Sequence, residues 1–287
     1  MNKQEGSDEM SEVLKDKNTS RRGFLRTAAV AGAGVVAAGS ARAATPDPLI
    51  TEVQPWAAEL GDGVDASPYG MPIQFEGDVV RRNVEWLTAD TISSINFTPI
   101  HALDGTITPQ GCAFERHHSG AIELRKQDYR LMINGMVDRP LIFSYEDLER
   151  FPRKNHVYFC ECAANTGMEW AGAQLNGAQF THGMIHNMEY TGVPLRALLE
   201  EAGYDTAGKW VYVEGADASS NGRSIPMDKA LDDVLVAFKA NGEALRKEHG
   251  YPVRLVVPGW EGNMWVKWLR RIEVMDGPVE SREETSK

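Results

Sequence analysis

Short blocks of apolar residues, separated by turn-forming residues, run along most of the chain and predict short strands and helices. Alternating or continuous apolar runs predict strands at 129–135, 157–162, 210–214, 253–257 and 271–274. Capping residues and helical spacing predict short helices at 90–95, 144–149, 194–201 and 227–231. Strands and helices intermix without a repeat and without a regular β–α–β alternation, which favours an α+β domain over a doubly wound sheet.

The first residues carry the pattern of an export signal. The sequence Ser-Arg-Arg-Gly-Phe-Leu-Arg at 20–26 precedes an uncharged stretch at 27–41, and small residues at Ala41 and Ala43 allow cleavage before Ala44. The paired arginines and the weak hydrophobicity resemble a twin-arginine signal, with an ordinary secretory signal or a membrane anchor as the alternative. We therefore expect residues 1–43 to be a signal peptide, the twin-arginine machinery to be a partner, and the protein to be periplasmic. Because this route exports folded proteins, the signal also favours a bound cofactor.

Composition and charge narrow the possible partners. The 287 residues are 42% hydrophobic and 25% charged, as in globular proteins, and the formal net charge is −11. An acidic chain does not attract nucleic-acid phosphates, so we expect no nucleic-acid partner. The three cysteines are too few for a disulfide framework, and their odd number leaves at least one free thiol. After the signal we expect an N-terminal arm at 44–95, one domain at 96–276 and the start of a linker at 277–287.

Two cysteines, Cys160 and Cys162, lie two residues apart in a predicted strand, so their side chains are expected on one face. The small residues after Cys162 place it at the strand end, beside an open loop. That position suits a thiolate ligand of a soft or redox-active metal. The alternative is that both thiols are packed in the core.

Other candidates are cationic or imidazole side chains. His117 and His118 follow Arg116 in a turn-rich segment, which indicates a binding cluster or an ordinary surface loop. His182 and His186 have the spacing of a helical zinc pair, but residues 181–190 lack helical apolar periodicity. Arg254 lies in an apolar strand, where an unpaired charge is costly, and therefore indicates an anion site or a structural salt bridge.

Sequence motifs of several other classes are absent. The sequence has no C-x-x-C-H for covalent haem, no G-x-G-x-x-G, no G-x-x-x-x-G-K-[ST] and no G-x-S-x-G. Dinucleotide-binding, P-loop and α/β-hydrolase functions are correspondingly disfavoured.

Taken together, six segments resemble the sulfite oxidase family of molybdenum enzymes, and most closely the molybdenum subunits of sulfane dehydrogenases. These segments are 97–101, 114–118, 161–165, 189–195, 222–226 and 241–271. The resemblance spans nearly all of the chain after residue 43. It implies a molybdopterin-binding domain of mixed sheets with short helices. In the family an immunoglobulin-like dimerisation domain follows; we expect that domain to be absent here and full-length relatives to be dimeric.

The resemblance also implies a site. Cys162 matches the cysteine whose thiolate ligates molybdenum, and Arg116 matches an arginine that reaches the substrate oxyanion, so both are expected to be catalytic. Arg254 and Lys267 are expected to neutralise the phosphate of the cofactor, and Asp217 and His249 to hydrogen-bond its pterin. The residues expected to bind Mo-molybdopterin are Phe114, Glu115, Arg116, His117, His118, Asp217, His249, Arg254, Trp265, Val266 and Lys267. Trp265 stands where sulfite oxidases commonly have a histidine.

Departures from the family pattern bear on the substrate. Thr166 and Gly167 occupy positions where sulfite oxidases carry arginines that help to bind sulfite. The loss of this cationic clamp favours a sulfur group carried on another protein. We expect oxidation of sulfane sulfur on a carrier protein, with water as the oxygen source and a c-type cytochrome as electron acceptor. In the family, the segment matching 281–287 leads into an active-site tyrosine, and we expect that residue to be missing here.

Four alternatives stay open at this point. They are a sulfite dehydrogenase, a periplasmic methionine sulfoxide reductase, an inactive cofactor-binding fragment, and a zinc protein that uses Cys162 with His117, His118 or His182.

Overall fold

A computed structural model of the chain describes residue 60, residues 70–84 and residues 92–282. The described helices and strands all lie within the unit Ala66–Lys287. The predicted signal peptide at 1–43 and most of the predicted arm at 44–95 lie outside the described residues. Within the described ranges, no helix combines the length and the apolar character that a membrane crossing requires.

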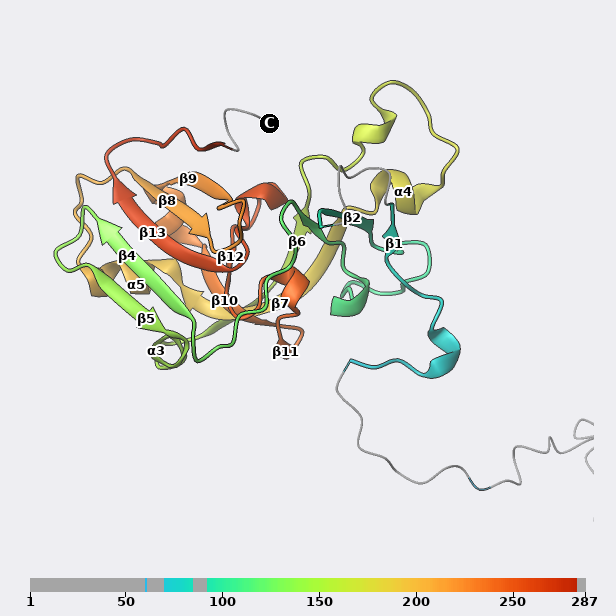
Figure 1. Ribbon diagram of the computed structural model, residues 1–287, viewed down its shortest axis with the longest axis horizontal. Coiled ribbons are helices and arrows are strands. Elements are labelled where there is room, and N and C mark those ends of the chain that lie inside the picture. The colour runs from blue at the N-terminus through green and yellow to red at the C-terminus, as the bar shows by residue number, and fades with distance from the viewer. Residues whose placement is uncertain (1–59, 61–69, 85–91, 283–287) are drawn as a thin grey trace, which may run out of the picture. The chain divides into compact units, whose positions relative to one another are not determined.

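A mixed five-stranded sheet forms one layer of the domain (Figure 1). Its strand order is β5 (Leu141–Ser144), β4 (Arg130–Gly135), β13 (Leu269–Met275), β8 (Trp210–Gly215) and β9 (Gly222–Pro226). The central strand β13 is parallel to β4 and antiparallel to β8. The predicted strands at 129–135, 210–214 and 271–274 are therefore confirmed.

The second sheet is antiparallel. It contains β11 (Glu243–Ala244), β10 (Leu235–Ala240), β7 (Ile185–Pro194) and β6 (Lys154–Glu161), with β12 (Arg254–Val256) also pairing with β10. The prediction of strands at 157–162 and 253–257 is confirmed to within a few residues. Close approach of β7 and β10 depends on Gly192, because a Cβ atom there would lie 2.5 Å from the carbonyl oxygen of Val236.

A small third sheet corrects one prediction. It consists of β1 (Arg82–Asn83), β2 (Ser94–Phe97) and β3 (Arg116–His117). The expected helix at 90–95 is wrong for Ser94 and Ile95, which pair with His117 and Arg116 in antiparallel register. Pairing with a distant strand overrides the local preference of this segment.

The helices are short and serve as connections. They are α3 (Tyr145–Glu149), α4 (Ala178–His182), α5 (Leu195–Ala202) and α6 (Met227–Asp232). The 3-10 turns are η3 (Gln74–Glu76), η5 (Gln110–Cys112), η6 (Gly167–Glu169), η7 (Lys247–His249) and η8 (Gly262–Met264).

Sequence signals at the ends of these helices have the expected structural role. The Ser144 side chain accepts a hydrogen bond from the Asp147 backbone, and the Asp147 carboxylate accepts one from the Ser144 backbone, which forms the predicted capping box. Helix α5 ends at Gly203, whose φ of 68° is a left-handed conformation that suits glycine. The buried leucines of α5 follow helical spacing, at positions 195, 198 and 199. The α+β prediction of mixed sheets with short helices is confirmed.

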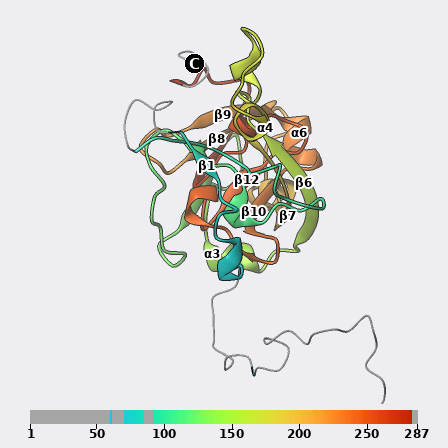
Figure 2. The same ribbon diagram turned by 90° about the vertical axis from the view of Figure 1, so that its right-hand side faces the viewer.

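The segment after β13 covers the outer edge of the first sheet. It runs past β9 in both views (Figures 1 and 2). The Ser224 side chain donates to the carbonyl of Val279 and accepts from the Val279 amide, while Ser281 donates to the carbonyl of Gly222. The first four residues of β9 are consequently buried although this strand ends the sheet.

The close contact at Gly192 gives a test of the second sheet. We expect Gly192→Ala to lower the free energy of unfolding by about 2 kcal/mol, because two backbones would have to separate. Gly277→Ala is the matched control, since its added Cβ would meet nothing within 4 Å and its effect should stay within about 0.5 kcal/mol. Chemical denaturation of both variants measures the difference. Equal stabilities would contradict the close-approach argument.

Candidate functional site: a cationic cavity with one thiol at its mouth

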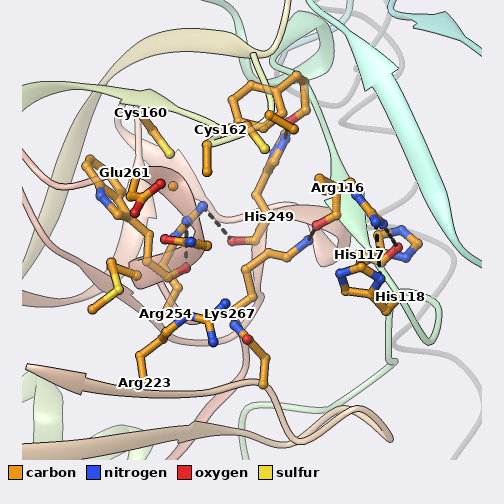
Figure 3. A pocket seen from close by; sticks show the side chains of 18 of the residues that line it. Arg116, His117, His118, Cys160, Cys162, Arg223, His249, Arg254, Glu261 and Lys267 are labelled. Atoms are coloured by element: carbon orange, nitrogen blue, oxygen red, sulfur yellow. Dashed lines mark hydrogen bonds between the residues drawn. The ribbon is translucent and has the colours of Figure 1, made fainter. Parts of the chain in front are cut away.

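A cavity of about 660 Å³ gathers most of the predicted site residues (Figure 3). That volume lies within the range of small-molecule and cofactor sites. The predicted residues that line it are Phe114, Arg116, His117, His118, Cys162, Asp217, His249, Arg254, Trp265 and Lys267. Residues that sequence reasoning did not assign to the site, but that also line the cavity, are Cys160, Ala163, Ala164, Trp170, His186, Asn221, Arg223, Glu248, Glu261, Gly262, Asn263, Met264 and Trp268.

Cys162 lies immediately after β6, at the strand end where the sequence places it. Its amide donates to the carbonyl of Met184 at 3.0 Å, and its carbonyl accepts from the Asn165 amide at 2.9 Å. The Asn165 side chain in turn accepts from the Met184 amide and donates to Glu161. The turn after Cys162 is therefore hydrogen-bonded to Met184, the residue before β7, which fixes the backbone of Cys162 at the cavity.

Burial raises the pKa of the Cys162 thiol, while the Ala164 amide and the charge of Arg116 act in the opposite direction. The isolated thiol is thus protonated at neutral pH. A metal ligand must be a thiolate, so metal binding here would release a proton. Cys160 also lines the cavity, as the shared strand face predicts, but burial raises its pKa to about 12.

Arg116 extends from β3 and is held by main-chain and imidazole acceptors. Its guanidinium donates to the carbonyl of His117 at 2.8 Å and to Nδ1 of His118 at 3.2 Å. Since arginine only donates, the His118 Nδ1 atom is the acceptor in this pair. The guanidinium is thus directed toward His117 and His118 (Figure 3), and its charge still acts on the Cys162 thiol by lowering the pKa.

Glu115 lies behind the cavity wall. Its carboxylate bonds to Nε2 of His117 at 2.6 Å and to the Asn96 side chain at 2.9 Å, and it pairs with Arg81 at 3.0 Å. Burial alone would raise its pKa, but these hydrogen bonds and charges prevail and lower it to about 2. Glu115 does not line the cavity, so its side chain acts by fixing His117.

Arg254 is a buried cation without a carboxylate partner among the described residues. Its side chain is 4% exposed, and its guanidinium donates to the carbonyls of His249, Trp265 and Leu255 at 3.2, 3.1 and 3.4 Å. The guanidinium also lies 5.8 and 5.7 Å from the ring centroids of Tyr190 and Trp265. The structural salt bridge considered from the sequence is not found in the described part of the chain, which leaves the anion-site interpretation.

Lys267 is a second cation held by carbonyl groups. Its Nζ donates to the carbonyls of Arg116 at 3.0 Å and Glu248 at 2.9 Å, and it lies 4.7 Å from the Trp268 ring centroid. Burial, followed by the charge of Arg254, lowers the pKa of Lys267 to about 7. A bound anion would reverse this effect by favouring the charged amine.

Trp265 and Val266, which precede Lys267 in the predicted cofactor-binding segment, differ in their position relative to the cavity. The Trp265 ring lines the cavity, its indole N–H donates to the carbonyl of Trp260, and its carbonyl accepts from Arg254. The Val266 side chain is fully buried and does not line the cavity. Any contribution of Val266 is therefore structural or through its backbone.

Two buried imidazoles face the cavity in the neutral form. The Nε2 atom of His249 lies 3.3 Å from the carbonyls of Ala113 and Phe114, so it carries the hydrogen. Its Nδ1 atom has no hydrogen-bond partner among the described residues. Burial, His186 and Arg254 lower the pKa of His249, and burial with Arg254 lowers that of His186 to about 3.

Asp217 provides a carboxylate on the cavity wall and is 6% exposed. One carboxylate oxygen accepts from the Asn221 amide at 3.4 Å. Asp217 can therefore accept a hydrogen bond from a bound ligand, as Nδ1 of His249 can.

The described residues do not support the zinc sites that were considered from the sequence. His182 ends α4 and His186 lies in β7, so the two do not share a helix, as the missing helical periodicity indicates. Within residues 70–84 and 92–282, no three His, Cys, Asp or Glu side chains gather closely enough to hold a metal. A metal bound through Cys162 would need further ligands from another molecule, as a dithiolene cofactor provides.

Comparison with known proteins places this geometry in a family. Residues 118–283 match the model of the oxidoreductase molybdopterin binding domain. Mouse mitochondrial sulfite oxidase is 34% identical over 182 residues, which cover 60% of this chain and 33% of the relative. Tomato (Solanum lycopersicum) nitrate reductase [NADH] is 34% identical over 191 residues, which cover 62% of this chain and 21% of the relative.

A solved structure is more similar still. The sulfane dehydrogenase SoxCD from Paracoccus pantotrophus is 74% identical, with a TM-score of 0.80, and the match covers 85% of this chain and 62% of that chain. The molybdopterin cofactor expected from the sequence is confirmed by the family match. The chain belongs to the molybdopterin-binding oxidoreductases of the sulfite oxidase family and is close to SoxC.

Proposed function

We propose that the protein oxidises a sulfur centre in a molybdenum-dependent reaction, with water as the oxygen source. The substrate would be sulfane sulfur on a SoxYZ-like carrier, and the electrons would pass to a SoxD-like c-type cytochrome. The observation that carries this proposal is the arrangement of one thiol, Cys162, and one cation, Arg116, in a cavity that also contains carbonyl-bound cations. The 74% identity to SoxCD supports the choice within the family.

The cavity residues fit Mo-molybdopterin. Arg254 and Lys267 provide positive charge for a phosphate, and Nδ1 of His249 provides an unpartnered acceptor for a pterin N–H. Cys162 would ligate the metal as its thiolate. When bound, the cofactor supplies the two-electron redox chemistry and the oxygen transfer, which protein side chains do not provide.

The role of Arg116 is to hold oxygen atoms of the substrate near Cys162. Its guanidinium is already oriented by His117 and His118, so little conformational freedom is lost when it binds. Each oxygen atom taken from water releases two protons and two electrons. The described carboxylates on the wall, Asp217, Glu248 and Glu261, lie where they can accept protons.

The loop after Cys162 favours a substrate that is carried on a protein. Thr166 and Gly167 bring no charge to this loop, and Thr166 adopts a left-handed conformation with φ of 63°. Trp170 lines the cavity while being 80% exposed, and Leu175 is also exposed. An exposed indole beside a loop without cations suits a protein partner better than a small free anion.

The cellular setting of the proposal comes from the sequence. The twin-arginine pattern at 20–26 supports export of the folded protein by the twin-arginine machinery, and the periplasm is where c-type cytochromes could accept its electrons. The chain spans about a third of the mouse sulfite oxidase and 62% of the SoxCD chain. Sulfite dehydrogenase activity is the second candidate, because the curated relatives include sulfite oxidases.

Substrate choice is the direct test of the proposed function. We expect turnover with the persulfidated carrier to exceed turnover with free sulfite by about tenfold or more in kcat/KM, because Thr166 and Gly167 supply no cation for sulfite. Reduction of a c-type cytochrome by the molybdenum-loaded protein measures both rates. The unmodified carrier serves as the control. Faster turnover of free sulfite would favour the sulfite dehydrogenase.

The metal ligand can be tested without an activity assay. We expect Cys162→Ser to reduce bound molybdenum from about one per chain to a small fraction of that value, because the hydroxyl is a poor substitute for a thiolate. Cys160→Ser, on the same strand, should keep its molybdenum. Elemental analysis of protein produced with its maturation machinery measures both variants. Zinc in place of molybdenum in the parent protein would contradict the proposal.

The lowered pKa of Lys267 predicts a pH dependence of the cofactor-free protein. Between about pH 7 and pH 10 the folded chain binds fewer protons at Lys267 than the unfolded chain, so this residue makes stability rise with pH. The rise is at most about 1.4 kcal/mol per pH unit. We expect Lys267→Met to flatten the curve of unfolding free energy against pH. An unchanged slope in the variant would show that Lys267 is charged throughout.

A further inference from the structure

Arg223 on β9 is a cavity cation that neither the family match nor the sequence comparison assigns to the cofactor. It lies opposite Val213 in the pairing of β9 with β8, and its side chain is 7% exposed. The strand around it is buried because the segment containing Val279 and Ser281 covers the sheet edge. A long cationic side chain is thus enclosed in the wall and opens onto the cavity.

Arg223 makes little use of its donors within the protein. Its Nη1 atom donates to the carbonyl of the adjacent Gly222 at 3.1 Å, and no described carboxylate forms an ion pair with it. An arginine carries five N–H donors, so most of them remain available to a ligand in the cavity. A buried guanidinium without a counterion is costly, and an anion that binds there recovers part of that cost.

Two other cationic side chains in the cavity resemble Arg223 in their hydrogen bonding. Arg254 and Lys267 also bond to backbone carbonyls, and neither has a carboxylate ion pair within the described ranges. Arg254 repels the charged form of Lys267, and Arg223 adds a third cationic side chain to the lining, so the arrangement favours a ligand with more than one negative charge. A phosphate monoester carries about −1.5 to −2 charges at pH 7.

The position of Arg223 separates it from the reacting centre. Figure 3 shows its side chain entering the cavity from the side opposite Cys162, below Arg254 and Lys267 in that view. Arg116, by contrast, acts on the charge of Cys162. A group that binds to Arg223 is therefore remote from the thiol that would ligate the metal.

We propose that Arg223 is a third cationic ligand of the cofactor phosphate, beside Arg254 and Lys267. Its planar guanidinium can bind two phosphate oxygens at once, which the point charge of Lys267 cannot do. The proposal rests on the proposed function in one respect, namely that molybdopterin fills this cavity. It does not depend on the identity of the sulfur substrate.

The test measures how long the loaded protein keeps its cofactor. We expect Arg223→Gln to release the pterin about tenfold faster than the parent protein. Arg223→Lys should release it at an intermediate rate, because lysine keeps the positive charge but cannot bind two phosphate oxygens at once. Arg150→Gln, which removes an arginine that is 77% exposed, is the control and should release it at the parent rate. Fluorescence of the oxidised pterin and molybdenum analysis follow the release.

A second measurement separates binding from a structural role. In protein made without the cofactor, Arg223→Gln should melt at the same temperature as the parent or higher, because an unpaired buried charge has been removed. In the loaded protein the same variant should melt lower. Equal destabilisation of both forms would show that Arg223 is structural and would overturn the proposal.

Turnover per bound molybdenum completes the comparison. Parent-like cofactor retention with a large loss of turnover would place Arg223 at the substrate and would also overturn the proposal. If no sulfur compound is oxidised by the parent protein, the proposed function fails, whereas the retention measurements still decide the role of Arg223.

Discussion

Buried positive charge without nearby carboxylate partners is the constraint on which the site depends. Arg254 and Lys267 are held by carbonyl oxygens of the backbone, and the described residues offer neither of them an ion pair. Carbonyl dipoles fix the position of a cation but do not neutralise it. The cavity therefore contains buried cationic side chains that no described ion pair neutralises, although the whole chain carries a net charge of −11. Such a cavity selects an anionic ligand.

The fold supplies the rigidity that this arrangement requires. Arg254 begins β12, which pairs with β10 in the second sheet, while Lys267 precedes β13 at the centre of the first. The amide of Leu255 donates to the carbonyl of Val266, and that of Leu269 to the carbonyl of Val253, so the two segments are hydrogen-bonded to each other. Cations from two sheets are thereby kept at fixed positions, with no need for an ion pair between side chains.

Sequence reasoning predicts the elements that are determined locally. The capping box of Ser144 and the glycine after α5 mark their helices because the relevant contacts lie within a few residues. It fails at Ser94 and Ile95, whose partners Arg116 and His117 are more than twenty residues away. It also misses β7, where the buried side of the alternation includes His186 and so does not form an apolar pattern.

Some residues of the site can likewise be identified from the local sequence, whereas others can be identified only from the tertiary structure. Cys162 and Arg254 are identifiable because a thiol at a strand end and a charge in an apolar strand are unusual. Arg223 is also a charged residue within a strand, but it is harder to identify. Its neighbours Gly222 and Ser224 are not strongly apolar, so a charge beside them is not unusual. Its burial depends on Val279 and Ser281, more than fifty residues later, and only the tertiary structure shows it.

The lining of the cavity runs in sequence from Phe114 to Trp268, and its outer wall at β9 is closed by Ser281. No fragment that ends before β13 can assemble this lining, because its long-range strand pairs would be missing. The wall of the cavity is therefore complete only when β13 and the segment that follows it are in place.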